Sequence, residues 1–387
     1  MKKILIFSLA YFPHVGGAEV AVKEITDRIS SEESEFHMIT HRFSKNDAKE
    51  EQMGNIRVHR VGGGASYLSK VLFVVRAAFA ARTLHKKEHF DGMWAMMSYM
   101  LFPIVLSGIR APYLLTLQEG DPFTHVFGRW FIRPFLPLLK KGFAHARDVQ
   151  AISHYLLAWA KSMGFPGKGS VVPNGVNTTH FAQIYAPEVI EKKRAELGKK
   201  EGDVFLVTTS RLVHKNAVDD VIRALPLLPK HIHFIICGTG KDEPMLRTLA
   251  SSLKVSNRIQ FLGQISHADM PLVLKACDIF VRPSRSEGMG NSFIEAMAVG
   301  LPVIATQEGG IADFLFDAKR NPDRETTGWA VDKNAPKQIA EAVEDILAHP
   351  EKATEVTKTA KALALGEYDW NLIASKMNSL FQDLAEC

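Results

Sequence analysis

Two glutamates, Glu287 and Glu295, lie eight residues apart with a glycine-rich turn between them. The run CDIFVRP before them predicts a buried strand, and the run LPVIAT after them predicts another. The apolar pattern between these runs predicts a helix that begins near Asn291. A strand, a glycine-rich turn and a helix N-terminus present backbone N–H groups to a phosphate. Carboxylates beside such a site suit hydroxyl groups, which sugar and ribose rings provide.

This layout resembles the paired-glutamate motif of the retaining glycosyltransferases with the GT-B fold, in particular glycosyltransferase family 4. The resemblance implies that Glu287 contacts the donor sugar and that Glu295 holds the ribose of the nucleotide. It also implies that the donor contacts Gly288 and Gly290 of the glycine-rich turn and Asn291 and Ser292 at the start of the helix. The alternative is a glycine-rich turn before a capped helix with two solvated acids.

A second predicted donor element follows the strand VFLVTTS, where the chain reads RLVHKN. A guanidinium and an ammonium near one strand end suit a diphosphate leaving group. The resemblance implies that Arg211 and Lys215 neutralise the charge that builds on this diphosphate. The family's commoner pattern has the lysine five residues after the arginine, whereas here Lys215 is four residues after it and Asn216 takes the fifth place. A solvated Lys215 therefore stays an alternative.

Glycine-rich turns recur at three further places that the resemblance assigns to the donor. The run PHVGGAE puts Gly16 and Gly17 between a strand and a helix, where the backbone closely approaches another group. The run CGTG puts Gly238 after another strand, beside the nucleotide. The segment IQFLGQIS meets the base through backbone near Ile265. Taken alone, each glycine pair also fits an ordinary tight turn.

Four polar residues of the first half are candidates for the acceptor side. Gln118 stands in YLLTLQEGDPF where many family members have a histidine, and an amide cannot act as a base. Glu119 and Asp121 follow it, and they either orient an acceptor or cap the next turn. His154 begins a predicted helix, as an acceptor-side residue or as a capping or packing residue.

The elements that must position these residues form two βα series. The first runs from KILIFSLA to DVQAIS, and the second begins at VFLVTTS and ends at GWAV. The length of 387 residues also suits two domains. We therefore predict an α/β protein with the GT-B fold, in which two Rossmann-like doubly wound domains face each other across a cleft. Residues 1–175 form the acceptor-side domain, residues 176–370 form the nucleotide-sugar domain, and residues 371–387 pack back on the first.

Composition narrows the class of protein. Hydrophobic residues make up 46% and charged residues 23%, as in ordinary soluble domains. The three cysteines have no CxxC spacing, which indicates a reducing compartment without a disulfide framework or a structural zinc. No pair of acids ends a strand in a DxD pattern, so we expect no catalytic metal and no cofactor besides the UDP-, GDP- or ADP-sugar substrate.

Positive charge is concentrated in the first half. Residues 1–178 hold 22 Lys and Arg against 14 Asp and Glu, a net charge of +8 in a chain whose total is +5. Residues 67–87 and 127–147 combine cations with apolar bulk, which suits either an anionic membrane surface or core packing with cations that reach water. We expect a cytoplasmic protein, either free or peripheral on the inner face of the plasma membrane, with no nucleic-acid partner.

The sequence therefore predicts a retaining, metal-independent hexosyltransferase that moves a sugar from a nucleotide sugar to the hydroxyl of a carbohydrate or lipid-linked acceptor. Cell-envelope glycan, polysaccharide or glycolipid synthesis is the expected setting. The alternatives are a sugar-nucleotide epimerase of the same fold, a Rossmann oxidoreductase and a non-catalytic nucleotide-sugar-binding protein.

Overall fold

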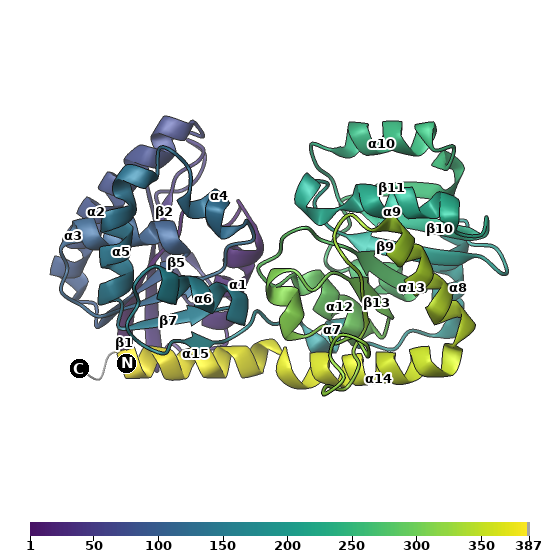
Figure 1. Cartoon of the computed structure of the whole chain (residues 1–387). Helices are drawn as coiled ribbons and strands as arrows, with labels where there is room; N and C mark the ends of the chain where they lie inside the picture. The colour runs from purple at the N-terminus through teal and green to yellow at the C-terminus, as the bar shows by residue number, and fades with distance from the viewer. Residues whose placement is uncertain (385–387) are drawn as a thin grey trace. The chain divides into compact units, whose positions relative to one another are not determined.

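The computed structural model describes residues 1–384, and the last three residues of the predicted C-terminal segment lie outside it. The chain divides into two compact units, which are coloured along the sequence in Figure 1. The first unit comprises residues 1–175 together with the chain from Trp370, and the second comprises Val176–Asp369. Each unit is an α/β body with a mainly parallel sheet, which confirms the predicted architecture of two Rossmann-like domains.

The sheet of the first unit has the strand order β3-β4-β2-β1-β5-β6-β7-β8 within the described residues. Its strands are β1 (Lys2–Phe7), β2 (Ser34–His41), β3 (Glu50–Met53), β4 (Ile56–Val61), β5 (Gly92–Met96), β6 (Tyr113–Leu117), β7 (Asp148–Ala151) and β8 (Ser170–Val171). Strands β1, β5 and β6 are almost fully buried because parallel strands are covered on both faces.

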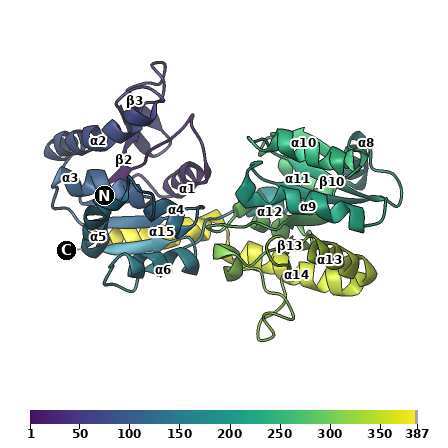
Figure 2. The same ribbon diagram turned by 45° about the horizontal axis from the view of Figure 1, so that its top comes forward.

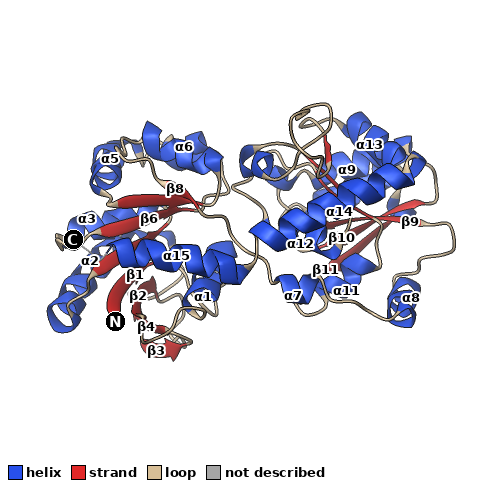
Figure 3. Ribbon diagram, turned by 90° about the horizontal axis from the view of Figure 1, so that it is seen from below, coloured by secondary structure: helices blue, strands red, loops and turns tan. Residues whose placement is uncertain are grey.

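The helices of the first unit cover both faces of this sheet. They are α1 (Gly17–Thr26), α2 (Tyr67–Glu88), α3 (Leu101–Ser107), α4 (Phe123–Phe127), α5 (Leu136–His145), α6 (His154–Ser162) and α15 (Trp370–Leu384). The last helix, α15, lies beside α1 (Figure 3) and buries Trp370 and Phe381 in the same core as β1 and β5. Helices α2 and α3 lie side by side (Figure 2), and α3 in turn packs on α5.

The sheet of the second unit is parallel throughout its described strands, in the order β11-β10-β9-β12-β13-β14. Its strands are β9 (Val204–Thr209), β10 (Ile232–Cys237), β11 (Ile259–Gly263), β12 (Ile279–Arg282), β13 (Val303–Ala305) and β14 (Trp329–Ala330). The neighbours β9 and β12 lie at the centre of the sheet, so the loops that follow them emerge at the same edge. These two loops contain the predicted residues Arg211, Lys215 and Glu287.

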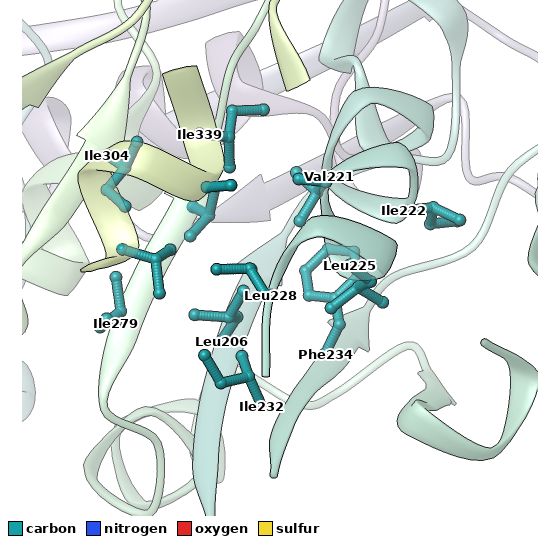
Figure 4. Close-up of a cluster of buried hydrophobic side chains, with 14 of the residues drawn as sticks. Leu206, Val221, Ile222, Leu225, Leu228, Ile232, Phe234, Ile279, Ile304 and Ile339 are labelled. Atoms are coloured by element: carbon teal, nitrogen blue, oxygen red, sulfur yellow. The ribbon is translucent and has the colours of Figure 1, made fainter. Parts of the chain in front are cut away.

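The second unit buries a large aliphatic core between this sheet and its helices. Those helices are α7 (Thr178–Phe181), α8 (Pro187–Glu196), α9 (Val218–Ala224), α10 (Glu243–Ser252), α11 (Met270–Lys275), α12 (Asn291–Val299), α13 (Pro336–Ala348) and α14 (Pro350–Glu367). Leu206 and Phe234 of the sheet meet Val221 of α9 and Ile339 of α13 in this core (Figure 4). Close packing of this kind keeps the two central strand ends in a fixed register.

The edge strand β3 was not predicted. Its sequence EEQM is charged and exposed, without the apolar alternation that indicates a strand. It pairs antiparallel with β4 through a turn at Gly54, whose φ is +56°. Charged residues on an edge strand discourage pairing with other chains, which explains why the pattern is polar.

Candidate active site

The loop between β12 and α12 brings Glu287 to the N-terminus of a helix. Helix α12 begins at Asn291, as predicted, and Gly290 is its N-cap with φ +90° and ψ 81°. A Cβ on Gly290 would lie 2.6 Å from the Phe293 ring and 3.1 Å from Cγ of Glu287. Glycine is therefore required here both by the backbone conformation and by the close approach of Glu287.

The two glutamates of the motif, Glu287 in this loop and Glu295 in α12, have different surroundings. The side chain of Glu287 is 12% exposed and forms an ion pair with the guanidinium of Arg282. Its Oε1 also accepts a hydrogen bond from the backbone N–H of Gly288 at 3.2 Å. Glu295 lies one turn inside α12, where burial raises its pKa to about 7 against the opposing effect of Arg282. Arg282 therefore lies close to both carboxylates of the motif.

In the loop after β9, Arg211 is exposed and Asn216 is buried. The side-chain N–H of Asn216 donates to the carbonyl of Arg211 at 2.7 Å, and Asn216 is only 4% exposed. The position where the family's commoner pattern has lysine therefore holds a buried amide that fixes the loop. Lys215 directly precedes Asn216 in a short 3-10 helix, and Lys215 is half-buried.

Another arginine, Arg285, connects the loop after β9 to the loop after β12 through hydrogen bonds. Its backbone N–H donates to the carbonyl of Lys215 at 2.7 Å. Its guanidinium donates to both carboxylate oxygens of Asp219 at 2.8 and 2.9 Å, and to Asp220 at 2.9 Å. Paired, charge-assisted bonds of this kind fix orientation as well as distance. The loops of Arg211 and Glu287 are thereby held in register with each other.

Close backbone packing inside the second unit explains why the CGTG turn contains glycines. Gly238 has φ +139°, and a Cβ on it would lie 1.9 Å from the carbonyl oxygen of Ser210. A Cβ on Gly240 would lie 2.2 Å from the carbonyl oxygen of Leu212, whose N–H donates to Thr239 at 2.9 Å. This turn therefore packs backbone to backbone against the Arg211 loop. The predicted contact of Gly238 with a nucleotide stays a prediction, as does that of the half-buried Ile265.

In the first unit, the turn at Gly16 and Gly17 is exposed and opens α1. The N–H of Gly16 donates to the carboxylate of Glu19 at 2.7 Å, which caps the helix. A Cβ on Gly17 would meet no atom within 4 Å, and its φ is not in the left-handed region. Packing within the described chain thus gives no reason for a glycine at 17, in contrast to Gly238.

The four candidate acceptor residues lie in different surroundings. Glu119 is 3% exposed, and its carboxylate accepts hydrogen bonds from the N–H and hydroxyl of Ser98 at 2.7 and 2.6 Å and from the N–H of Gln118 at 2.9 Å. Burial raises its pKa. Glu119 therefore ties the ends of β5 and β6 together, while Asp121 and His154 are exposed.

Gln118 faces inward. It lines a small cavity under α1 and α15 with Thr116 and Gln150, and its amide N and O atoms have no hydrogen-bond partner within the described residues. The helix that follows β7 begins at His154, as predicted, but its N-cap is Ser153, whose hydroxyl accepts from the N–H of Leu156 at 3.3 Å. Capping is thus performed by the residue before the histidine.

Two protein-family models match the chain in the order of its units. The model for Glycosyltransferase Family 4 matches residues 15–180, and the model for Glycosyl transferases group 1 matches residues 189–363. The second match contains both glutamates of the loop and Lys215. The chain is a group 1, family 4 glycosyltransferase.

Several relatives of this glycosyltransferase have known activities. A GDP-mannose-dependent monoacylated α-(1-6)-phosphatidylinositol monomannoside mannosyltransferase of Corynebacterium glutamicum is 29% identical over 242 residues, covering 60% of this chain and 61% of the relative. The alignment thus spans less than two thirds of that enzyme. The α-monoglucosyldiacylglycerol synthase of Acholeplasma laidlawii is 24% identical over 405 residues, covering 99% of this chain and 98% of the relative.

Solved structures of glycosyltransferases share the fold over the whole length. Sucrose-phosphate synthase from Thermosynechococcus elongatus superposes with a TM-score of 0.82 at 19% identity and covers 99% of each chain. Anabaena HepE in complex with UDP-glucose superposes with a TM-score of 0.79 at 20% identity, covering 99% of this chain and 100% of its own. The predicted GT-B fold is thereby confirmed.

Sequence reasoning missed two arginines beside Glu287, which are Arg282 at the end of β12 and Arg285 in the loop that follows. Their spacing, three residues apart around Pro283 and Ser284, is visible in the sequence, but their partners are not. Asp219 lies 66 residues from Arg285, so no local pattern reveals the pair. Within residues 1–384, no group of three or more His, Cys, Asp or Glu side chains is arranged to hold a metal ion.

Proposed function

We propose that this enzyme transfers a sugar from a nucleoside diphosphate sugar to an acceptor hydroxyl with retention at the anomeric carbon. One observation supports the proposal most strongly: Glu287 and Glu295 lie at the uncapped N-terminus of α12, whose N-cap is a glycine without a side chain. Backbone N–H groups there attract a phosphate, while the carboxylates bind hydroxyl groups of the sugar and the ribose.

In this proposal, the charge that develops on the departing diphosphate is stabilised by side chains and backbone. Arg211 is exposed at the end of β9, and Lys215 follows it in the same loop. The N–H groups of Gly290, Asn291 and Ser292 at the start of α12 add a helix terminus to these two cations. Preorganised charge of this kind is usually the largest catalytic contribution. Gly288, in the turn before α12, stays a proposed donor residue, and the assignment of Gly17 to the donor stays a prediction.

The experiment that tests this proposal screens UDP-, GDP- and ADP-sugars for release of nucleoside diphosphate, with a lipid extract or a sugar as acceptor. We expect release from at least one donor, formation of a glycoside, and equal rates with and without excess EDTA. Activity that is lost on chelation and restored by magnesium would contradict the proposed metal independence. Release of nucleotide and an epimerised sugar with no glycoside formed would favour an epimerase.

For the acceptor, we propose a lipid-linked molecule at an anionic membrane surface. The names of the two curated relatives described above contain a phosphatidylinositol monomannoside and a monoglucosyldiacylglycerol, which are both glycolipids. No helix among the described residues is long and apolar enough to cross a membrane. Attachment would therefore depend on surface side chains of the first unit, where the net charge of residues 1–178 is +8.

An exposed apolar stripe on α2 supports this acceptor class. Tyr67, Val71, Val75 and Phe79 recur every four residues and are 65%, 49%, 47% and 63% exposed, so they share one helix face. The stripe continues into the second basic stretch, because the rings of Tyr67 and Phe131 are 6.1 Å apart.

The loop of Phe131 also presents the most exposed aromatic side chain of this surface. Trp130 is 82% exposed. Arg133, Lys140 and Lys141 are exposed close by in the sequence. Large apolar side chains ringed by cations suit the headgroup layer of an anionic membrane. We therefore propose that the enzyme is cytoplasmic and that this surface binds the inner face of the plasma membrane.

A further inference from the structure

Arg282 is a buried cation directly before the proposed donor loop, which comprises residues 283–290 between β12 and α12. It is the last residue of β12 and is only 7% exposed. A buried guanidinium is costly unless ion pairs and hydrogen bonds replace its lost water. The partners that Arg282 has acquired therefore indicate what the protein gains from it.

Within residues 1–384, the guanidinium of Arg282 donates hydrogen bonds only to side chains of the donor loop and of the first turn of α12. Its Nε donates to the hydroxyl of Ser284 at 3.1 Å, and its Nη1 donates to the hydroxyl of Ser292 at 2.6 Å. Its Nη2 forms the ion pair with Glu287. The guanidinium also lies 4.7 Å from the centre of the Phe293 ring in the first turn of α12. One side chain thus connects the strand end, the sugar-binding glutamate of the proposal and the helix N-terminus.

Arg258 of the same unit shows what a purely structural buried arginine looks like. It is 8% exposed, and it donates to the backbone carbonyls of Ile232, Leu225 and Pro229 at 2.8, 2.7 and 2.8 Å. Its bonds join main-chain segments and touch no side chain of the donor loop. The two arginines have nearly equal burial and the same number of hydrogen-bonded nitrogens, but different kinds of partner.

We propose that Arg282 is a positioning residue for donor recognition, which holds the carboxylate of Glu287 and the hydroxyl of Ser292 in the geometry that the donor requires. This inference rests on the proposed function of the loop. A free Glu287 carboxylate beside an uncapped helix N-terminus would be drawn to the N–H groups of its first turn. There it would occupy the place of the donor phosphate. The ion pair with Arg282 keeps it away from them and directs it toward the sugar.

The test compares kcat/KM for the donor in Arg282→Leu, Arg282→Lys and the matched control Arg258→Leu, each measured per folded enzyme. We expect Arg282→Leu to lose at least about tenfold in kcat/KM, the scale on which contacting residues are coupled. Arg282→Lys retains the charge without the planar fork, so it should recover part of that loss. The Arg258→Leu control should lower the melting temperature while leaving kcat/KM of the folded enzyme within about twofold of wild type.

A double-mutant cycle separates positioning from general damage. Because Arg282 acts largely through Glu287, the loss in the double variant Arg282→Leu/Glu287→Gln should be well below the product of the two single losses. Losses that multiply, or an Arg282→Leu enzyme that behaves like the Arg258→Leu control, would overturn the inference. If Arg282→Leu does not fold, the same cycle is run with Arg282→Lys. A fully active Glu287→Gln enzyme would instead overturn the assigned role of the loop in the proposed function.

Discussion

The loops of the second unit and those of the first unit hold their polar residues in different ways. In the second unit, Glu287 is 12% exposed and is bonded to Arg282, and Arg285 bonds the Glu287 loop to the Arg211 loop. In the first unit, the acceptor candidates Asp121 and His154 are exposed. Glu119 is buried there, and its carboxylate accepts hydrogen bonds from Ser98 and from the N–H of Gln118.

This difference matches the division of work that the proposed function implies. A site built on strand ends and locked by charge-assisted bonds is suited to a ligand of fixed shape. Exposed loops on a rigid scaffold change sequence at little cost in stability, so they suit ligands that vary. A nucleotide sugar is the fixed ligand, and the acceptor is the variable one. Single substitutions should therefore matter most on the donor side.

The largest effect of a single substitution should come from Glu287→Gln. The change keeps the size of the side chain but removes the charged acceptor, and charge-assisted hydrogen bonds are about twice as strong as neutral ones. We expect turnover per folded enzyme to fall by about a hundredfold or more. The melting temperature should also fall, because the buried guanidinium of Arg282 loses its charged partner. Glu243→Gln, which breaks a surface pair with Arg247, is the control and should leave turnover unchanged. Equal turnover in both variants would remove Glu287 from the mechanism.

Arg211→Ala should follow, with a loss of about a hundredfold in turnover, since it removes one donor that stabilises developing charge. Lys215→Ala should cost less, because the buried Asn216 fills the position where lysine is commoner. Steady-state kinetics of the two variants decide the order. A Lys215→Ala enzyme that is the more damaged of the two would show that this lysine takes the diphosphate role despite its shifted spacing.

On the acceptor side, several cations should have to be removed together. Replacing Arg129, Arg133, Lys140 and Lys141 by glutamine should weaken binding to anionic vesicles by up to about a thousandfold, since each of the four cations contributes about 1 kcal/mol near such a surface. Donor hydrolysis in solution should be unchanged. The control replaces four exposed lysines of the second unit, Lys230, Lys254, Lys337 and Lys358.

For the wild-type enzyme, vesicle binding should weaken as salt rises, because exposed charges are screened over about 8 Å at physiological ionic strength. It should be absent on neutral vesicles. If anionic vesicles bind no enzyme at low salt, or if both quadruple variants bind alike, then the basic stretches are ordinary surface and a soluble acceptor is the better proposal.

The smallest predicted effect concerns Glu295 and pH. Burial raises its pKa to about 7 in the folded chain, against about 4.3 in an unfolded one. Between these values the folded chain binds more protons, so the free energy of unfolding falls as pH rises. The melting temperature of wild type relative to Glu295→Gln should therefore drop by about a few degrees between pH 4.5 and pH 7. If the melting temperatures of wild type and Glu295→Gln change in parallel with pH, the result would contradict a buried Glu295 carboxyl with a raised pKa.

Local patterns were enough to predict the strand, turn and helix around the paired glutamates. The start of α12 at Asn291 follows from an apolar helical pattern after a glycine-rich turn. The same kind of reasoning could not give the reason for Gly238, because the atom that requires glycine there is the carbonyl of Ser210 in another loop. Nor could it identify Arg282 and Arg285 as structural partners of the site. Side-chain bonds between distant segments leave no periodic signal in the sequence.

The claim that the donor binds at the N-terminus of α12 is tested most directly by calorimetric titration of UDP, GDP and ADP into two glycine variants of that helix. Gly290 and Gly300 flank its two ends with φ of +90° and +93°, so alanine is strained at both. A Cβ at 300 would meet only the Lys361 side chain at 3.7 Å, whereas at 290 it would strike Phe293 and Glu287. Gly290→Ala should weaken the preferred nucleotide by at least about tenfold, and Gly300→Ala should bind as wild type does. Equal affinity in the two variants would contradict the account.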